Sequence, residues 1–169
     1  MKEKLVLSVL VDNVSGVLQR VANLFSRRGY NIESLTVSET EDPAFSRMTI
    51  ETYTDAENVR QIKTQLLKLE IVKKVAELTE EKSVSSELLL VKVSTETVDK
   101  KNALLIFNNH YGARVVDFSK TTITLELTGA ASIIDEFIEK IESEYGIVEL
   151  ARTGVTSLER GEGSFTDDI

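Results

Sequence analysis

The sequence predicts an α+β fold made of two βαββαβ units in tandem, and three observations support this prediction. Apolar residues alternate with the period of a strand and then recur with the period of a helix, in the order strand, helix, strand, strand, helix, strand. The same order starts again at an offset of roughly 80 residues, although the halves share little identity. A polar stretch, "TEEKSVSSE" at residues 79–87, separates the halves.

The first half opens with the strand pattern "EKLVLSVLV" at residues 3–11. Apolar residues take helical spacing from Val17 until Gly29, a residue type that commonly ends helices. Residues 31–39 and 46–53 alternate as two strands around a turn, which predicts a hairpin.

A second helix and a final strand complete the first half. The helix is marked by an apolar stripe, and "IVKKVAEL" at residues 71–78 follows as a strand. The stripe consists of Val59, Ile62, Leu66 and Leu69. This order is that of a ferredoxin-like unit, in which a four-stranded antiparallel sheet carries both helices on one face.

The second half repeats the order with weaker helical signals. We expect a helix at about residues 97–110 and another with a clear apolar stripe that ends at Gly146. The expected strands are 88–94, 113–119, 122–128 and 147–158. The predicted organisation is a first domain at 1–79, a linker at 80–87, a second ferredoxin-like domain at 88–160 and a flexible tail at 161–169.

Composition narrows the possible partners. The chain has 20 Lys and Arg against 28 Asp and Glu, so its net charge of −8 argues against nucleic-acid binding. It contains no apolar run of the ~18–20 residues that a membrane span needs. The sequence passes from Met1 directly into a strand pattern rather than a signal peptide. We therefore expect a cytoplasmic protein without a nucleic-acid or membrane partner.

The inventory of catalytic side chains is small. His110, the only histidine, stands at the end of a predicted helix, where a surface imidazole is the ordinary explanation. The chain contains no cysteine, which excludes disulfides and thiolate metal sites. The carboxylate-rich segments 80–82 and 139–144 read as solvated surface. We expect no catalytic residue, no metal site and no cofactor site in this chain.

The polar stretch "DNVSG", residues 12–16, joins the first strand to the first helix, where backbone N–H groups lack intrahelical acceptors. Two interpretations stay open. In the first, Asn13 or Ser15 caps the helix and Gly16 relieves crowding in the turn. In the second, Gly16 lets a ligand approach the free N–H groups, which hold its carboxylate, as a zwitterionic amino acid requires. Useful affinity then requires burial of the ligand, for which the meeting of two chains is one route.

Residues 12–50, with "NVSGVL", "LFSRRGYNIESLTV" and "SRMTI", strongly resemble the ACT domain of the acetolactate (acetohydroxyacid) synthase small-subunit family. The second half continues the resemblance with "ELLLVKV", "GARVVDFS" and "VELARTGVTSLERG". The similarity covers roughly residues 3–161. It implies that the first unit is an ACT domain.

The resemblance further implies a regulatory subunit of branched-chain amino-acid biosynthesis that activates a separate catalytic subunit and confers feedback inhibition by valine. The catalytic partner decarboxylates pyruvate and forms the new carbon–carbon bond, and it holds thiamine diphosphate, Mg and FAD. A homodimer through the ACT domains is expected, with valine bound where two of them meet. Leucine or isoleucine satisfies the same main-chain chemistry and differs by only ~1–3 kcal/mol per methylene.

The family's loop pattern falls on Asn13, Gly16 and Leu18, and a further family position falls on Asn31. The resemblance implies backbone contacts from the neighbouring Val14, Ser15 and Val17. Val14 departs from the family, which favours a polar residue there, and Leu18 has the simpler explanation of a core residue.

Two other classes of function remain open at this point. A free-standing amino-acid sensor of tandem ACT-type modules would act through another protein partner, without a thiamine-dependent enzyme. A small enzyme on a ferredoxin-like scaffold, such as a phosphatase, would show turnover by the isolated chain.

Overall fold

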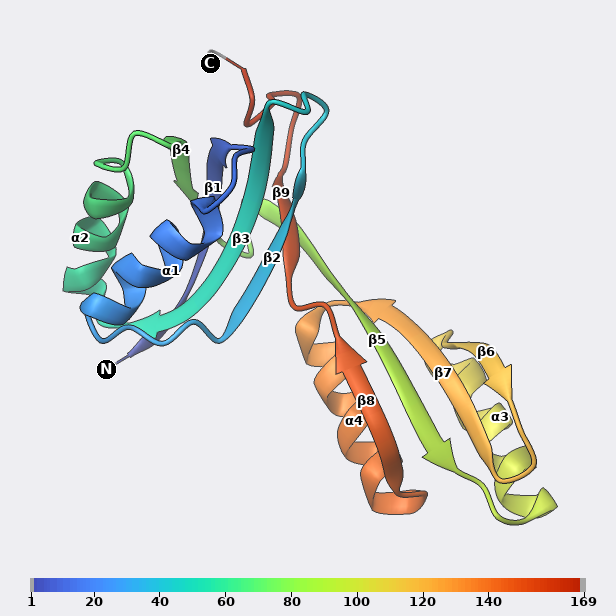
Figure 1. Cartoon of the computed structure of the whole chain (residues 1–169). Helices are drawn as coiled ribbons and strands as arrows, with labels where there is room; N and C mark the ends of the chain where they lie inside the picture. Colours follow the sequence, from blue (N-terminus) through green and yellow to red (C-terminus); the bar gives the residue numbers. More distant parts are fainter. Residues whose placement is uncertain (1, 168–169) are drawn as a thin grey trace. The chain divides into compact units, whose positions relative to one another are not determined.

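The computed structural model describes residues 2–167, and the chain forms two compact units (Figure 1). Unit 1 comprises Met1–Ser85 and Val155–Ile169, and unit 2 comprises Ser86–Gly154. Each unit contains an antiparallel sheet with two helices on one face, which confirms the predicted fold class. Within residues 2–167, no helix is both long and apolar enough to cross a membrane.

The sheet of unit 1 has four strands in the order β2-β3-β1-β4. The strands are β1 (Glu3–Asp12), β2 (Ser34–Glu39), β3 (Phe45–Thr54) and β4 (Val72–Glu77). β1 pairs with β3 from Glu3 opposite Thr54 to Asp12 opposite Phe45. β2 therefore forms one edge of this sheet.

Helices α1 (Val17–Arg27) and α2 (Ala56–Leu66) cover one face of this sheet, as Figure 1 shows. Alternate residues of β1 point into the core between sheet and helices because side chains of a strand alternate between its faces. The fully buried centre of this core includes Leu7, Val9, Phe25, Met48, Ile50, Ile62 and Leu66.

Unit 2 repeats the arrangement with the strand order β6-β7-β5-β8. Its strands are β5 (Ser83–Ser94), β6 (Arg114–Phe118), β7 (Thr122–Gly129) and β8 (Ile147–Arg152). Its helices are α3 (Val98–Tyr111) and α4 (Ala131–Glu144). Thr97 caps α3 by accepting the Lys100 N–H at 3.2 Å, and α4 buries the Phe137 ring in the core.

The segment predicted as a linker differs from that expectation. β5 begins at Ser83, and its first residues belong to unit 1. The hydroxyls that make this segment look polar are bonded inside unit 1. Ser83 Oγ donates to Thr79 O at 2.6 Å, and Ser85 Oγ lies 2.6 Å from Ser157 Oγ. Satisfied hydroxyls thus allow a strand where composition predicts a linker.

The end of the chain also differs from the prediction. The segment expected as one strand at 147–158 forms β8 and a separate strand β9 (Thr156–Glu159), with Gly154 at φ +79° between them. From Val155 onward the chain belongs to unit 1, not to the second domain expected at 88–160. The expected flexible tail, 161–169, contains Phe165 with only 7% of its surface exposed. Residues 168 and 169 lie outside the described residues.

Candidate functional site

The loop between β1 and α1, residues 13–16, is the effector site that the sequence predicts, and for that prediction it is hereafter called the effector loop. Its last residue, Gly16, occupies the N-cap position of α1 with φ +83°, a left-handed conformation that glycine adopts without strain. No side chain caps α1 within the described residues. The interpretation in which Asn13 or Ser15 caps the helix is therefore wrong.

The side chain of Asn13 forms hydrogen bonds that connect this loop to the β2–β3 hairpin. Asn13 Nδ2 donates to Glu39 Oε1 and to Pro43 O, each at 3.0 Å, and Asn13 Oδ1 accepts from Ser46 Oγ at 3.1 Å. The Asn13 N–H also donates to Ala44 O at 2.8 Å. Because an amide oxygen has two lone pairs, Oδ1 retains one that can accept a further donor, such as an ammonium group.

The backbone of the loop offers unpaired donors. Within residues 2–167, no acceptor bonds the N–H groups of Ser15, Gly16 and Leu18. The first turn of α1 carries no acidic side chain that would compete for an anion. These donors lie at the positive end of the α1 dipole. The interaction with this dipole stabilises an exposed carboxylate by about 0.3–1 kcal/mol. The loop can therefore receive a carboxylate.

The apolar residues around the loop divide into core and surface. Val17 is 9% exposed and packs in the core, so only its backbone is available to a ligand. Leu18, for which a core position was the simpler expectation, is 45% exposed, and Val14 is 54% exposed. The loop thus presents polar donors beside uncovered apolar side chains.

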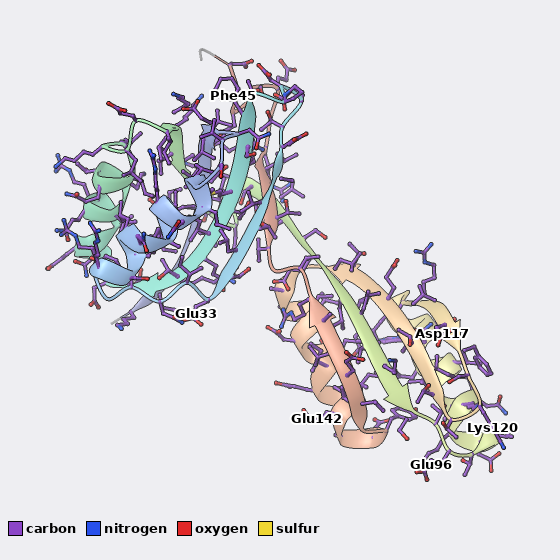
Figure 2. All side chains as sticks on the ribbon, viewed as in Figure 1. Glu33, Phe45, Glu96, Asp117, Lys120 and Glu142 are labelled. Atoms are coloured by element: carbon purple, nitrogen blue, oxygen red, sulfur yellow. The ribbon has the colours of Figure 1, made fainter. Side chains whose placement is uncertain are left out.

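Asn31 lies at the opposite end of the sheet from Asn13. Its Nδ2 donates to Glu33 Oε1 at 2.7 Å, and its carbonyl accepts from Thr52 Oγ1 at 2.6 Å. Asn13 instead binds Glu39, at the other end of β2. Figure 2 labels Glu33 and Phe45, which mark these two ends of unit 1. A single chain therefore does not bring Asn31 to the effector loop.

Three cavities within residues 2–167 were compared with the predicted site, and none of the predicted site residues lines them. One lies between α1 and α2, has a volume of about 380 Å³ and is lined by basic residues that include Arg20, Arg27, Arg28 and Lys68. The effector loop itself is open to solvent. Adding a Cβ to Gly16 would meet nothing within 4 Å.

His110 and the Glu136 carboxyl have structural explanations. His110 is exposed in the last turn of α3, beside the Tyr111 ring. Lys140 and Tyr111 donate to Glu136 Oε1, and these hydrogen bonds lower the pKa of the Glu136 carboxyl. Within residues 2–167, no His, Asp and Glu side chains cluster as a metal site would require.

Comparison with known proteins decides the family. A family model described as "AHAS small subunit-like ACT domain" matches residues 7–74, and one described as "Small subunit of acetolactate synthase" matches residues 86–161. The chain belongs to the family of acetolactate synthase small subunits. The ACT-domain match includes the effector loop and Asn31.

Relatives and a solved structure agree over nearly the whole chain. The acetolactate synthase isozyme 3 small subunit of Escherichia coli is 42% identical, and the match covers 93% of this chain and 96% of that one. The small subunit of Mycolicibacterium smegmatis is 43% identical, with 92% and 90% covered. The crystal structure of the Thermotoga maritima small subunit superimposes with a TM-score of 0.86 at 34% identity, covering 95% of this chain and 99% of that one.

The sequence did not reveal the partners of Asn13. Glu39, Pro43 and Ser46 hold its amide although they are 26 to 33 residues away along the chain. The available signal was the hairpin pattern around Asp42-Pro43, whose register places Glu39 opposite Ser46.

Proposed function

We propose that this family member is a regulatory subunit that activates a separate acetolactate synthase catalytic subunit and makes it sensitive to valine. One observation supports the effector site most directly: the N–H groups of Ser15, Gly16 and Leu18 are unpaired at a helix N-terminus. They suit the carboxylate of an amino acid, and Asn13 Oδ1 suits its ammonium group.

We further propose that the site is completed by a second copy of the chain. β2 is an edge strand, and its Val37 is 41% exposed. Antiparallel pairing of β2 with β2 of a second copy lays the Glu39 end of one strand beside the Ser34 end of the other. The effector loop of one chain then approaches Asn31 of its partner, which no single chain achieves.

The chemistry belongs to the catalytic partner in this proposal. That subunit decarboxylates pyruvate and forms the carbon–carbon bond, and it holds thiamine diphosphate, Mg and FAD. Valine acts by binding one state of the complex more tightly than another, and such coupling is typically worth about 1–3 kcal/mol. A free-standing sensor would instead bind valine without changing the activity of any acetolactate synthase.

Isothermal titration of the purified chain with valine tests the effector site, with leucine and lysine as comparison ligands. We expect saturable valine binding that Asn13→Ala removes, because this change releases the loop from Glu39, Pro43 and Ser46. Asn102→Ala is the matched control, since Asn102 is exposed on α3 of unit 2. Valine binding by the Asn13 variant at unchanged affinity would contradict the proposed site.

Acetolactate formation by the reconstituted complex tests the regulatory role. We expect addition of the chain to raise the activity of the catalytic subunit and to make that activity valine-sensitive. A catalytic subunit whose activity is unchanged by the folded chain would contradict the proposal and favour the free-standing sensor.

A further inference from the structure

Residues 155–167, hereafter the C-terminal strap, return to unit 1 after unit 2 is complete. β9 of the strap pairs with β5, and the Arg160 N–H donates to Lys82 O at 2.8 Å. Thr36 Oγ1 of β2 donates to Val155 O at 2.7 Å. The Thr36 side chain lies on the sheet face opposite the helices, so the strap docks on that face.

Phe165 is the main anchor of the strap. Its ring lies 4.9 Å from the Arg47 guanidinium carbon and 5.3 Å from Lys74 Nζ, in two cation–π contacts. Arg47 and Lys74 are the cross-strand neighbours of Leu10 on either side. Leu10 has no exposed surface although it faces away from the helices, which indicates that Phe165 covers it.

The strap also holds the turn of the β2–β3 hairpin. Thr166 Oγ1 donates a short hydrogen bond to Glu41 Oε1, which lowers the pKa of the Glu41 carboxyl. Glu41 lies between Glu39 and Pro43, the two residues that accept from Asn13 Nδ2. The effector loop and the strap therefore both contact the same hairpin, residues 39–47. The loop contacts it through Asn13, and the strap contacts it through Phe165 and Thr166.

We infer that Phe165 and Thr166 are positioning residues for the effector loop, and that strap docking and effector binding favour each other through the 39–47 hairpin. This inference rests on the proposed function of the loop. A docked strap fixes the hairpin, and the fixed hairpin holds the Asn13 amide. Because coupling between two sites is reciprocal, an effector held by the loop stabilises the docked strap in return.

The test compares the full chain with Phe165→Ala and Thr166→Val, which remove the ring and the hydroxyl donor respectively. We expect the valine Kd to rise about 5-fold or more in each variant, the usual lower range of such coupling. Thr166→Ser keeps the donor and should restore the affinity. Leu158→Ala is the matched control within the strap, since Leu158 is 60% exposed and should leave the Kd unchanged.

Hydrogen exchange separates this inference from the proposed function. Exchange of the Asn13 N–H, which bonds Ala44 O, should accelerate in Phe165→Ala even without ligand. Valine should slow exchange of the Arg160 N–H in the wild-type chain. An unchanged Asn13 exchange rate or an unchanged valine Kd in a folded Phe165→Ala chain would overturn the inference. Absence of valine binding by the wild-type chain would contradict the proposed function, and Asn13 exchange would still decide the positioning role.

Discussion

At the scale of single residues, Gly16 combines a backbone requirement with an open surface. Its φ of +83° disfavours other residues, yet a Cβ built there meets nothing within 4 Å. The same two facts hold for Gly29, at φ +71° beyond the other end of α1. The left-handed backbone conformation therefore explains why glycine occurs at both positions. We expect a substitution at Gly16, but not one at Gly29, to affect ligand binding.

We predict that Gly16→Asp abolishes valine inhibition while activation of the catalytic subunit largely remains. The new carboxylate occupies the loop where the ligand carboxylate would bind. Gly29→Ala is the control, because it adds left-handed strain of about 1–2 kcal/mol without touching the loop. Activity assays with and without valine measure the effect. Loss of inhibition in both variants would point to α1 stability rather than to the loop.

Glu87 is a buried carboxylate for which composition predicted only a linker position. It is 5% exposed and accepts from Arg152 Nη2 at 2.7 Å, while Arg152 Nη1 donates to Asp135 Oδ1 at 2.7 Å. We predict that Arg152→Ala lowers the free energy of unfolding of unit 2 by about 3 kcal/mol, because it leaves the Glu87 charge buried and unpaired. Urea denaturation measures the loss.

The control for that prediction is Lys92→Ala. Lys92 and Glu149 form an exposed pair at 3.2 Å, with 40% and 73% of their side-chain surfaces accessible. Exposed pairs contribute about 0–1 kcal/mol, so this variant should unfold nearly as the wild type does. Equal losses of unfolding free energy in Arg152→Ala and Lys92→Ala would show that the burial of Glu87 does not cause the loss.

At the scale of elements, β2 is the strand on which the proposed dimer depends. We predict that Val37→Glu yields a folded chain that is monomeric and binds no valine, because like charges would face each other across the two-fold axis. Val148→Glu, at a 57% exposed strand position of unit 2, should leave both properties intact. Sedimentation velocity and valine titration check these outcomes. A dimeric Val37→Glu chain would exclude β2 as the interface.

The sequence predicted most elements because the hydrophobic pattern of each one depends only on residues that are close together along the chain. Strand alternation and helical spacing located the helices and strands β1 to β8, and α3, expected at 97–110, is Val98–Tyr111. However, β5 begins at Ser83 rather than at residue 88, and β9 was not separated from β8. The sequence could not predict that Ser83 and Ser85 enter a strand, because their hydroxyl partners include Ser157, far along the chain. For the same reason it predicted the loop position of Asn13 and the β2–β3 hairpin, but not the hydrogen bonds between them.

At the scale of the whole molecule, unit 2 is an insertion within unit 1. The chain leaves unit 1 after Ser85 and re-enters it at Val155, and the hydroxyls of Ser85 and Ser157 lie 2.6 Å apart. Inside unit 2, the Thr153 N–H donates to Leu88 O at 3.1 Å, so the outgoing and returning segments stay adjacent. Two neighbouring segments of the chain therefore connect unit 2 to unit 1.

We predict that replacing residues 86–154 with an Asn-Gly turn gives a folded unit 1 that retains its strap. Chain 1–79 alone should be less stable, because it lacks the strap and exposes Leu10 and Thr49, which are 0% and 3% accessible in the full chain. Thermal unfolding and protection of the Leu10 amide from exchange compare the two. Equal stability of the two fragments would show that the strap contributes nothing to unit 1.

This insertion also sets an order of events during synthesis. The ribosome releases β1 to β4 first, but residues 155–167 emerge only after all of unit 2 has been made. Until then, the sheet face that contains Leu10 lacks its Phe165 cover, although the helix-covered core can already form. A nascent chain of this protein thus passes through a stage in which unit 1 is folded but lacks its strap, and only translation of the strap completes the unit.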